Sequence, residues 1–197
     1  MPSKKSGLSA AEYAVLGLVY RQPGHGYQIA QELAPNRGLG LICPLRLSNV
    51  YFLLGNLEQG GLIEVARRQD DVYPPKTVFQ VTAAGRRAFQ SWIRQPLTRL
   101  RQVRLDFLLK VYFLRQHGVE RILGLLNEQI EFCQRYVSEW KALVQSTEPD
   151  SFDCLAMQSR VAAAQGTLDW LIQYRQQLSG EASQSHRPAA ARRKRSG

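Results

Sequence analysis

The sequence has few of the residues from which disulfide frameworks, metal sites and catalytic centres are built. Its three cysteines, Cys43, Cys133 and Cys154, lie far apart, and no CxxC pair is present. This odd, scattered set argues against a disulfide framework and a zinc site, so we expect buried thiols. His25 stands alone between two glycines, which favours a structural role. Because no nucleophile, paired-carboxylate or phosphate-loop pattern is present either, we expect neither an enzyme nor a metal or cofactor.

The sequence also lacks the apolar run of about 20 residues that a membrane-spanning helix requires. Its first seven residues are mostly polar and contain no apolar stretch typical of a signal peptide. We therefore expect a cytoplasmic protein without a membrane partner. With 197 residues, the chain is long enough to bury a core in one domain or two small ones.

Basic residues exceed acidic residues, and the formal net charge of +10 is unevenly distributed. Residues 1–95 carry 11 basic and 6 acidic side chains, residues 96–178 carry 10 and 9, and residues 179–197 carry 5 and 1. A basic excess suits a polyanion, because each neutralised phosphate releases condensed counterions. The pattern favours nucleic acid as a partner but predicts neither fold nor sequence specificity.

Residues 48–63 predict a short helix, a glycine stop and the start of a strand. Ser48 is the expected N-cap, and Gly60 and Gly61 are expected to end the helix in the left-handed conformation. The apolar side chains recur at i, i+3, i+4 and i+7, at Val50, Leu53, Leu54 and Leu57. This spacing gathers them on one face, which we expect to pack on a core.

Two helices are expected before this element. Ser9 and Glu12 have the spacing of a capping box for a helix over residues 10–21. A second short helix is expected over residues 25–33, after the break at Pro23.

A β-hairpin and a further helix are expected after it. The apolar period changes to two, which predicts strands over residues 62–68 and 76–82. Thr82 is the expected N-cap of a helix over residues 83–93. Three helices, a hairpin and a linking helix make a winged helix-turn-helix.

The same segment resembles the PadR family of bacterial transcriptional regulators over roughly residues 8–95. The matching pieces are His25-Gly26-Tyr27, the Tyr51 helix with Leu57-Glu58, Gly61-Leu62-Ile63, Pro75-Lys76 and Val81-Thr82-Ala83-Ala84-Gly85-Arg86. The resemblance implies a dimeric DNA-binding protein, in most members a repressor. The type member of the family responds to phenolic acids.

The chain beyond residue 96 turns helical, with two long helices expected over residues 120–145 and 152–178. Their apolar positions alternate spacings of three and four, which is a heptad seam, although Arg175 interrupts it. Such a seam can close a bundle within one chain, form a dimer interface, or do both, and the resemblance implies a dimer interface. The candidate dimerisation residues are Leu123, Leu126, Ile130, Cys133, Val137, Trp140, Val144, Leu168 and Leu171.

These patterns predict a mainly α fold with a small β-hairpin, divided into three parts. Residues 8–95 form the winged helix-turn-helix domain, and residues 96–178 form a helical, coiled-coil-like dimerisation domain. Residues 179–197 are rich in glycine, serine, glutamine and basic residues, and we expect a disordered basic tail.

The outer face of the helix at residues 48–63 supplies the candidate base-reading residues. Asparagine can pair with adenine through two hydrogen bonds, so Asn49 and Asn56 are the expected readers. Tyr51 either reaches DNA or packs half-buried at the flank, and Phe52 either touches a thymine methyl group or packs on a neighbour. The full candidate set is Ser48, Asn49, Tyr51, Phe52 and Asn56.

This helix departs from the resembled family in its charge. Relatives usually carry arginine or lysine at its centre, where this sequence has Gly55 and Asn56, and Glu58 is the only charged residue. Phosphate contacts must then come largely from other positions. The candidates are Lys4, Lys5, Arg46, Arg67, Arg68 and Lys76.

The interpretation we favour is a PadR-like homodimeric regulator, a repressor rather than an activator, that binds an inverted-repeat operator in double-stranded DNA. The neutral helix supports an alternative, in which the winged helix is a protein-interaction module. A small aromatic effector is a further candidate partner, for which Trp92 and Trp140 are the candidate ligand-binding residues.

Overall fold

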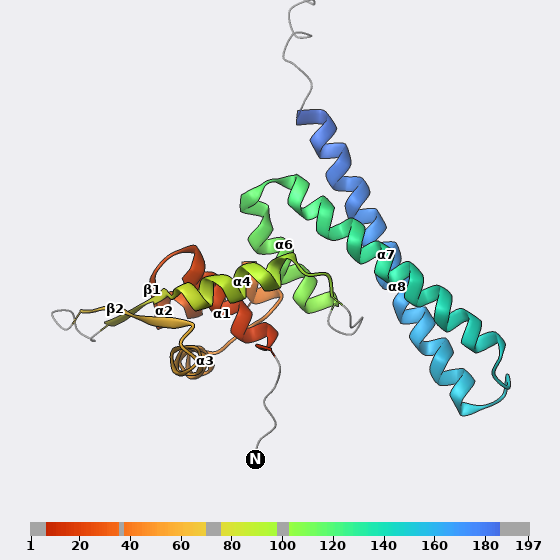
Figure 1. Cartoon of the computed structure of the whole chain (residues 1–197), viewed down its shortest axis with the longest axis horizontal. Helices are drawn as coiled ribbons and strands as arrows, with labels where there is room; N and C mark the ends of the chain where they lie inside the picture. Colours follow the sequence, from red (N-terminus) through yellow and green to blue (C-terminus); the bar gives the residue numbers. More distant parts are fainter. Residues whose placement is uncertain (1–6, 36–37, 70–75, 98–102, 186–197) are drawn as a thin grey trace, which may run out of the picture. The chain divides into compact units, whose positions relative to one another are not determined.

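The computed structural model describes residues 7–35, 38–69, 76–97 and 103–185. Its contacts divide the chain into two compact units (Figure 1). The first comprises Met1–Gln95 with Gln102–Gln116, and the second comprises Pro96–Arg101 with His117–Gly197. Each unit is described by itself.

The first unit is built around α1 (Ala10–Arg21), in which the six consecutive residues 14–19 are buried. The predicted capping box is present: the Ser9 N–H donates to the Glu12 carboxylate over 2.8 Å, and the Glu12 N–H donates to Ser9 Oγ over 3.3 Å. Helix α2 (Gly26–Glu32) follows a short break. An ion pair between Arg21 and Glu32, at 3.2 Å, joins the ends of the two helices.

Helix α3 (Leu47–Gln59) follows the 3-10 turn η1 (Gly38–Leu41) and buries the four apolar residues that were expected to face the core. The prediction that Ser48 caps this helix is wrong. Its N-cap is Arg46, whose side chain makes no capping hydrogen bond. At the other end, Gly61 takes a φ of 67°, the left-handed conformation that favours glycine.

The wing belongs to a three-stranded antiparallel sheet in the order β1-β3-β2. Strands β2 (Ile63–Gln69) and β3 (Lys76–Val81) form the predicted hairpin, and residues 70–75, which connect them, lie outside the described residues. The third strand, β1 (Gly24–His25), was not predicted, because two residues between helices carry no periodic signal. It pairs with β3 and ties α2 to the wing.

Helix α4 (Ala83–Arg94) begins at Thr82, as predicted. The Thr82 hydroxyl accepts from the Gly85 N–H over 3.0 Å and donates to the Gly61 carbonyl over 2.7 Å. One side chain therefore caps α4 and bonds to the chain at the point where α3 ends.

The segment after α4 extends the first unit beyond the expected boundary at residue 96. A π-helical turn, η2 (Val103–Phe107), leads into α6 (Leu108–Leu114), and both cluster with the winged helix. Phe113 packs edge-on against Phe89 of α4 with ring centroids 5.2 Å apart. These contacts join residues far apart in the sequence, so a periodicity argument could not detect them.

Lys110 of α6 is buried, with 1% of its surface exposed. Its amino group donates to the Gln95 carbonyl at the end of α4 and lies 5.1 Å from the centre of the Trp92 ring. Burial lowers the pKa of Lys110 to about 8, although the nearby Asp106 carboxylate opposes that shift. The lysine thus supports the C-terminus of α4, where a cation is favoured by the helix dipole.

The second unit is a helical hairpin of α7 (Val119–Gln145) and α8 (Phe152–Ser185), with the 3-10 turn η3 (Arg115–His117) before it. Helices α7 and α8 lie side by side within one chain (Figure 1), and residues of both heptad seams are buried there. Six of the nine candidate dimerisation residues are buried there: Leu126, Ile130, Cys133, Val137, Leu168 and Leu171. The seam therefore forms the hairpin's own core, which is the intramolecular alternative.

Two further features of the second unit were not predicted. Helix α8 continues to Ser185, so residues 179–185 are helical rather than part of a disordered tail. The buried Gln129 amide accepts from the Leu97 N–H over 2.8 Å and donates to the Leu97 carbonyl over 3.1 Å. This clamp fixes the start of the unit on α7.

None of the helices in the described ranges is both long enough and apolar enough to cross a membrane.

Replacing Lys110 with methionine should remove a pH dependence of stability in the alkaline range. The pKa of Lys110 is about 8 in the folded chain against an ordinary value of 10.5, so between these values the unfolded chain binds more protons. The free energy of unfolding of the unmodified chain should then rise with pH, relative to Lys110→Met, by at most about 1.4 kcal/mol per pH unit. Urea unfolding at pH 7 to 10 measures the difference.

The matched control is Lys141→Met, because Lys141 is an exposed lysine of α7. The pH dependence measured for Lys110→Met is compared with the one measured for this variant. A constant difference for Lys110→Met would contradict the burial of the Lys110 amine.

Candidate nucleic-acid interface

The outer face of α3 lies opposite its four buried apolar residues. Ser48, Phe52, Gly55 and Gln59 follow one another along the middle of this face, and Phe52 is 67% exposed. Figure 1 shows α3 nearly end on, at the edge of the first unit. The helix therefore packs on the first unit with one face and leaves most of the other face exposed.

Asn49 and Asn56 share a row with Phe52, because they stand three residues before it and four residues after it. Asn49 is exposed and Asn56 is half-buried. Their amide groups carry donors and acceptors, whereas Phe52 is apolar. The row thus combines two hydrogen-bonding groups with one apolar group between them.

Tyr51 lies at the flank of this face and packs on the start of α2. A Cβ atom added to Gly26 would lie only 2.5 Å from Cε1 of Tyr51, so the ring fits because residue 26 is glycine. The side chain nevertheless remains 52% exposed. This contact explains why a glycine follows His25 and links the start of α2 to α3.

His25 is the N-cap of α2, where its Nδ1 accepts from the Gln28 N–H over 3.2 Å. Burial lowers the pKa of His25, and the positive charge of Lys76 lowers it further. A lowered pKa favours the neutral ring, which an accepting Nδ1 requires. The geometry agrees with the structural role expected for this residue.

The candidate phosphate-binding residues that the structure describes lie outside α3. Arg46 is exposed immediately before the helix, and Arg67 and Arg68 are exposed on β2. Consecutive strand residues point to opposite faces, so the two arginines cannot both face the same side of the wing. Lys76 is half-buried on β3, and Lys4 and Lys5 lie outside the described residues.

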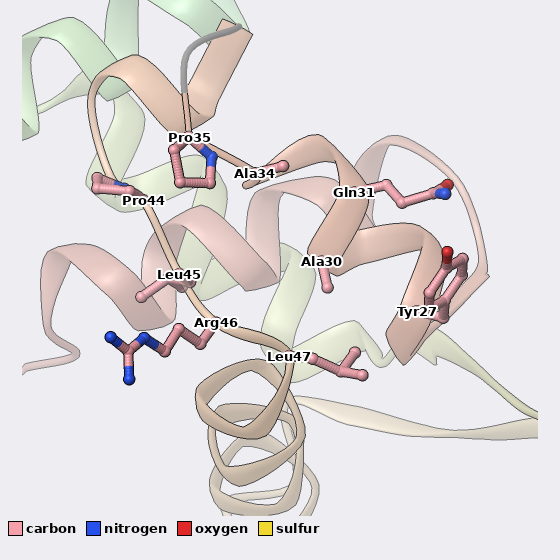
Figure 2. Close-up of a pocket in the computed structure, with 9 residues that line it drawn as sticks. All are labelled: Tyr27, Ala30, Gln31, Ala34, Pro35, Pro44, Leu45, Arg46 and Leu47. Carbon is pink, nitrogen blue, oxygen red and sulfur yellow. The ribbon is translucent and has the colours of Figure 1, made fainter.

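An open pocket of about 510 Å³ lies between α2 and the segment that leads into α3 (Figure 2). Tyr27 and Leu47 line it with 55% and 43% of their surfaces exposed, and Figure 2 shows the Leu47 side chain directed toward Tyr27. Neither residue was among the predicted site residues, although Leu47 is an apolar residue directly beside the expected start of a helix. The remaining lining residues are Ala30, Gln31, Ala34, Pro35, Pro44, Leu45 and Arg46.

The two candidate ligand-binding tryptophans belong to different units, and each is packed within its own. Trp92 stacks on Tyr13 with centroids 4.3 Å apart and also lies near the Lys110 amine. Trp140 lies beside Tyr136, and the Arg160 guanidinium stands 4.8 Å from the centre of its ring. Both rings thus make packing contacts within their own units, and ligand binding by Trp92 and Trp140 stays a prediction.

Within the described ranges, no group of three or more histidine, cysteine, aspartate or glutamate side chains is placed to hold a metal ion.

The close contact between Gly26 and Tyr51 should appear as a coupling energy. Gly26→Ala should lower the free energy of unfolding by about 1–3 kcal/mol, because the added methyl group displaces the ring. The double variant with Tyr51→Ala should lose less than the sum of the two single losses. Urea unfolding of the four proteins measures this, and additive losses would contradict the contact.

Gly124→Ala in α7 is the matched control, since a Cβ atom there meets nothing within 4 Å. That substitution should stabilise the chain by up to about 1 kcal/mol, because alanine favours the helix.

Comparison with known proteins relates both halves of the chain to described families. Residues 15–91 match the model of the transcriptional regulator PadR-like family, and residues 103–179 match the virulence activator alpha C-terminal model. The negative transcriptional regulator PadR of Bacillus subtilis (strain 168) is 26% identical over 147 residues, which are 72% of this chain and 79% of that protein.

Two solved structures of Bacillus subtilis PadR are also similar to this chain. The complex with operator DNA has 21% identity and a TM-score of 0.39, covering 86% of this chain and 99% of that chain. The complex with p-coumaric acid has 19% identity and a TM-score of 0.40, covering 87% of this chain and 99% of that chain. The matched N-terminal family is one of transcriptional regulators, in agreement with the expectation that the chain is not an enzyme.

Proposed function

We propose that this chain is a transcriptional repressor of the PadR-like family, to which its winged-helix unit belongs. In this proposal the chain binds operator DNA as a homodimer. The observation that carries the proposal is the outer face of α3, which is exposed and held by a buried apolar face behind it. A helix of this width fits a major groove about 12 Å wide. DNA binding also accords with the cytoplasmic location expected from the sequence.

The proposal divides DNA binding between two sets of residues. Asn49 and Asn56 read adenine edges, because an asparagine amide can pair with adenine through two hydrogen bonds. The phosphates are contacted by Arg46, Lys76 and one arginine of the wing. These cations attract DNA of any sequence. Since Glu58 is the only charged residue of α3, discrimination and electrostatic attraction are supplied by different elements.

Repression is supported by the curated relative, whose name is negative transcriptional regulator PadR. A protein that occupies an operator excludes other proteins from the same DNA, so the simplest mechanism is steric. The proposal of a small aromatic effector is supported by the family resemblance alone, because Trp92 and Trp140 are each packed within their own unit.

The homodimer is supported by apolar surface that the hairpin leaves uncovered. Leu143, Phe152 and Leu155 are large apolar residues that stay exposed on the second unit, near the loop between α7 and α8. Exposed apolar side chains that lie close together often mark an interface. A dimer would place two copies of α3 in successive major grooves about 34 Å apart, so the operator should be an inverted repeat.

The alternative, a winged helix that binds another protein, is favoured by the pocket beside α3. Tyr27 and Leu47 expose apolar surface there, which suits a protein contact. The two functions differ in their dependence on salt. Affinity for DNA falls steeply as salt rises, whereas a largely apolar protein contact persists.

Asn49→Ala and Lys76→Ala should change DNA binding in different ways. Binding sites are first selected from a random double-stranded DNA library with the full chain, and fluorescence anisotropy then measures affinity for a selected and a scrambled site. Asn49→Ala should reduce the difference between the two sites by about 1–3 kcal/mol, because a base contact is lost. Lys76→Ala should weaken both sites alike and lower the salt slope by about 1.

Equal losses on both sites for both variants would contradict this division of roles. Lys141→Ala, which removes an exposed lysine of the second unit, is the control and should leave both affinities unchanged.

The dimer predicts a paired footprint. Hydroxyl-radical footprinting on a selected site should protect two half-sites related by an inverted repeat, with centres about 34 Å apart. Joint replacement of Phe152 and Leu155 by glutamate should shift the chain toward a monomer in sedimentation, because charge at a buried interface is costly. The exposed Gln173→Glu substitution of α8 is the control. A single unpaired half-site would rule out the dimer.

A further inference from the structure

Phe52 is the largest side chain on the outer face of α3, and about two thirds of its surface is exposed, at 67%. Helix α3 has no cation on this face, since Glu58 is its only charged residue. A single exposed apolar side chain is common in proteins, so exposure alone does not indicate a role. The position of Phe52 relative to its neighbours supplies the argument.

Phe52 stands between Asn49 and Asn56 in one row on the helix surface. Neighbours at these spacings lie about 5–6 Å apart, and seven residues of helix rise about 10 Å. Bases along one DNA strand are about 3.4 Å apart, so the row spans about three base-pair steps. The three side chains can therefore reach base pairs within one run of about four in a half-site.

The rotation of this row is fixed by the buried face of α3. Val50, Leu54 and Leu57 are almost fully buried, so the helix cannot turn about its axis without exposing them. The row then points outward without any contribution from DNA. Binding loses little entropy to orient it, which favours recognition by the row itself.

The chemistry of the row matches A·T base pairs. Among the groups on the major-groove edges of the bases, the thymine C5-methyl group is the apolar one, and adenine offers the donor and acceptor that asparagine pairs with. Guanine is usually read by arginine or lysine, which α3 lacks. An apolar ring between two asparagines therefore suits a thymine methyl group among adenines.

We infer that Phe52 recognises the C5-methyl group of a thymine within each half-site, and that α3 reads an A·T-rich sequence. The inference rests on the proposed function, because it requires α3 to enter the major groove. Beyond the proposed function, this inference names the class of DNA sequence that is bound and the residue that selects for a methyl group. Phe52 is on this view a specificity-determining residue, whereas Asn49 and Asn56 supply hydrogen bonds to the flanking adenines.

Replacing thymine by deoxyuridine tests the inference, because it removes the methyl group and keeps the base pairing. The full chain first selects sites from a random double-stranded library, and each thymine of the selected half-site is then replaced in turn. Replacement of the thymine opposite Phe52 should weaken binding about fourfold per half-site, the effect of exposing one buried methyl group. Replacement of thymines outside the three central steps should have no effect.

The variant Phe52→Ala should bind the thymine site more weakly and be insensitive to deoxyuridine. Phe52 is on the surface, so the variant should keep the unfolding transition of the unmodified chain. Gln59→Ala, which changes another exposed residue of the same face, is the matched control and should keep the fourfold effect.

Three outcomes overturn the inference while the proposed function stands. The selected half-site has no thymine, the unmodified chain is insensitive to every deoxyuridine replacement, or Phe52→Ala keeps the full deoxyuridine effect. If the chain selects no DNA at all, the proposed function fails together with the inference, and the exposed ring belongs to a protein contact.

Discussion

The arrangement of the winged helix depends on the burial of one face of α3. Val50, Leu53, Leu54 and Leu57 pack into the core of the first unit and are together worth several kcal/mol by the transfer of apolar surface from water. Because a helix has a fixed period, burying these four positions also decides which residues point outward. The neighbouring contacts add to the same constraint, since the Thr82 hydroxyl bonds to the Gly61 carbonyl at the end of α3.

The elements with local signals could be predicted from the sequence. Ser9 and Glu12 gave the start of α1, and Thr82 gave the start of α4, because a cap and its partner lie within one turn. Strand β1 could not be predicted, since two residues show no period. The start of α3 was misjudged because Ser48 has the chemistry of a cap, whereas the helix begins one residue earlier.

In the candidate site, too, features within one element could be predicted and contacts between elements could not. The exposed positions of α3 followed from its buried positions, but the fit of Tyr51 on Gly26 did not, because it joins two elements. The heptad seam of the second unit was equally ambiguous, since period alone cannot say whether its partner is in the same chain. In the structure α7 and α8 are partners of each other, and the burial of Lys110 in the first unit had no signal at all.

The central claim is that α3 discriminates between sequences while cations elsewhere supply the attraction. The direct measurement is the affinity of the full chain for a selected site and a scrambled site over a range of salt concentrations. Both affinities should fall steeply as the salt concentration rises, with the same slope of log affinity against log salt concentration. The difference in binding free energy between the two sites should then stay constant. A difference that disappears as salt rises, or an affinity that does not depend on salt, would contradict this claim.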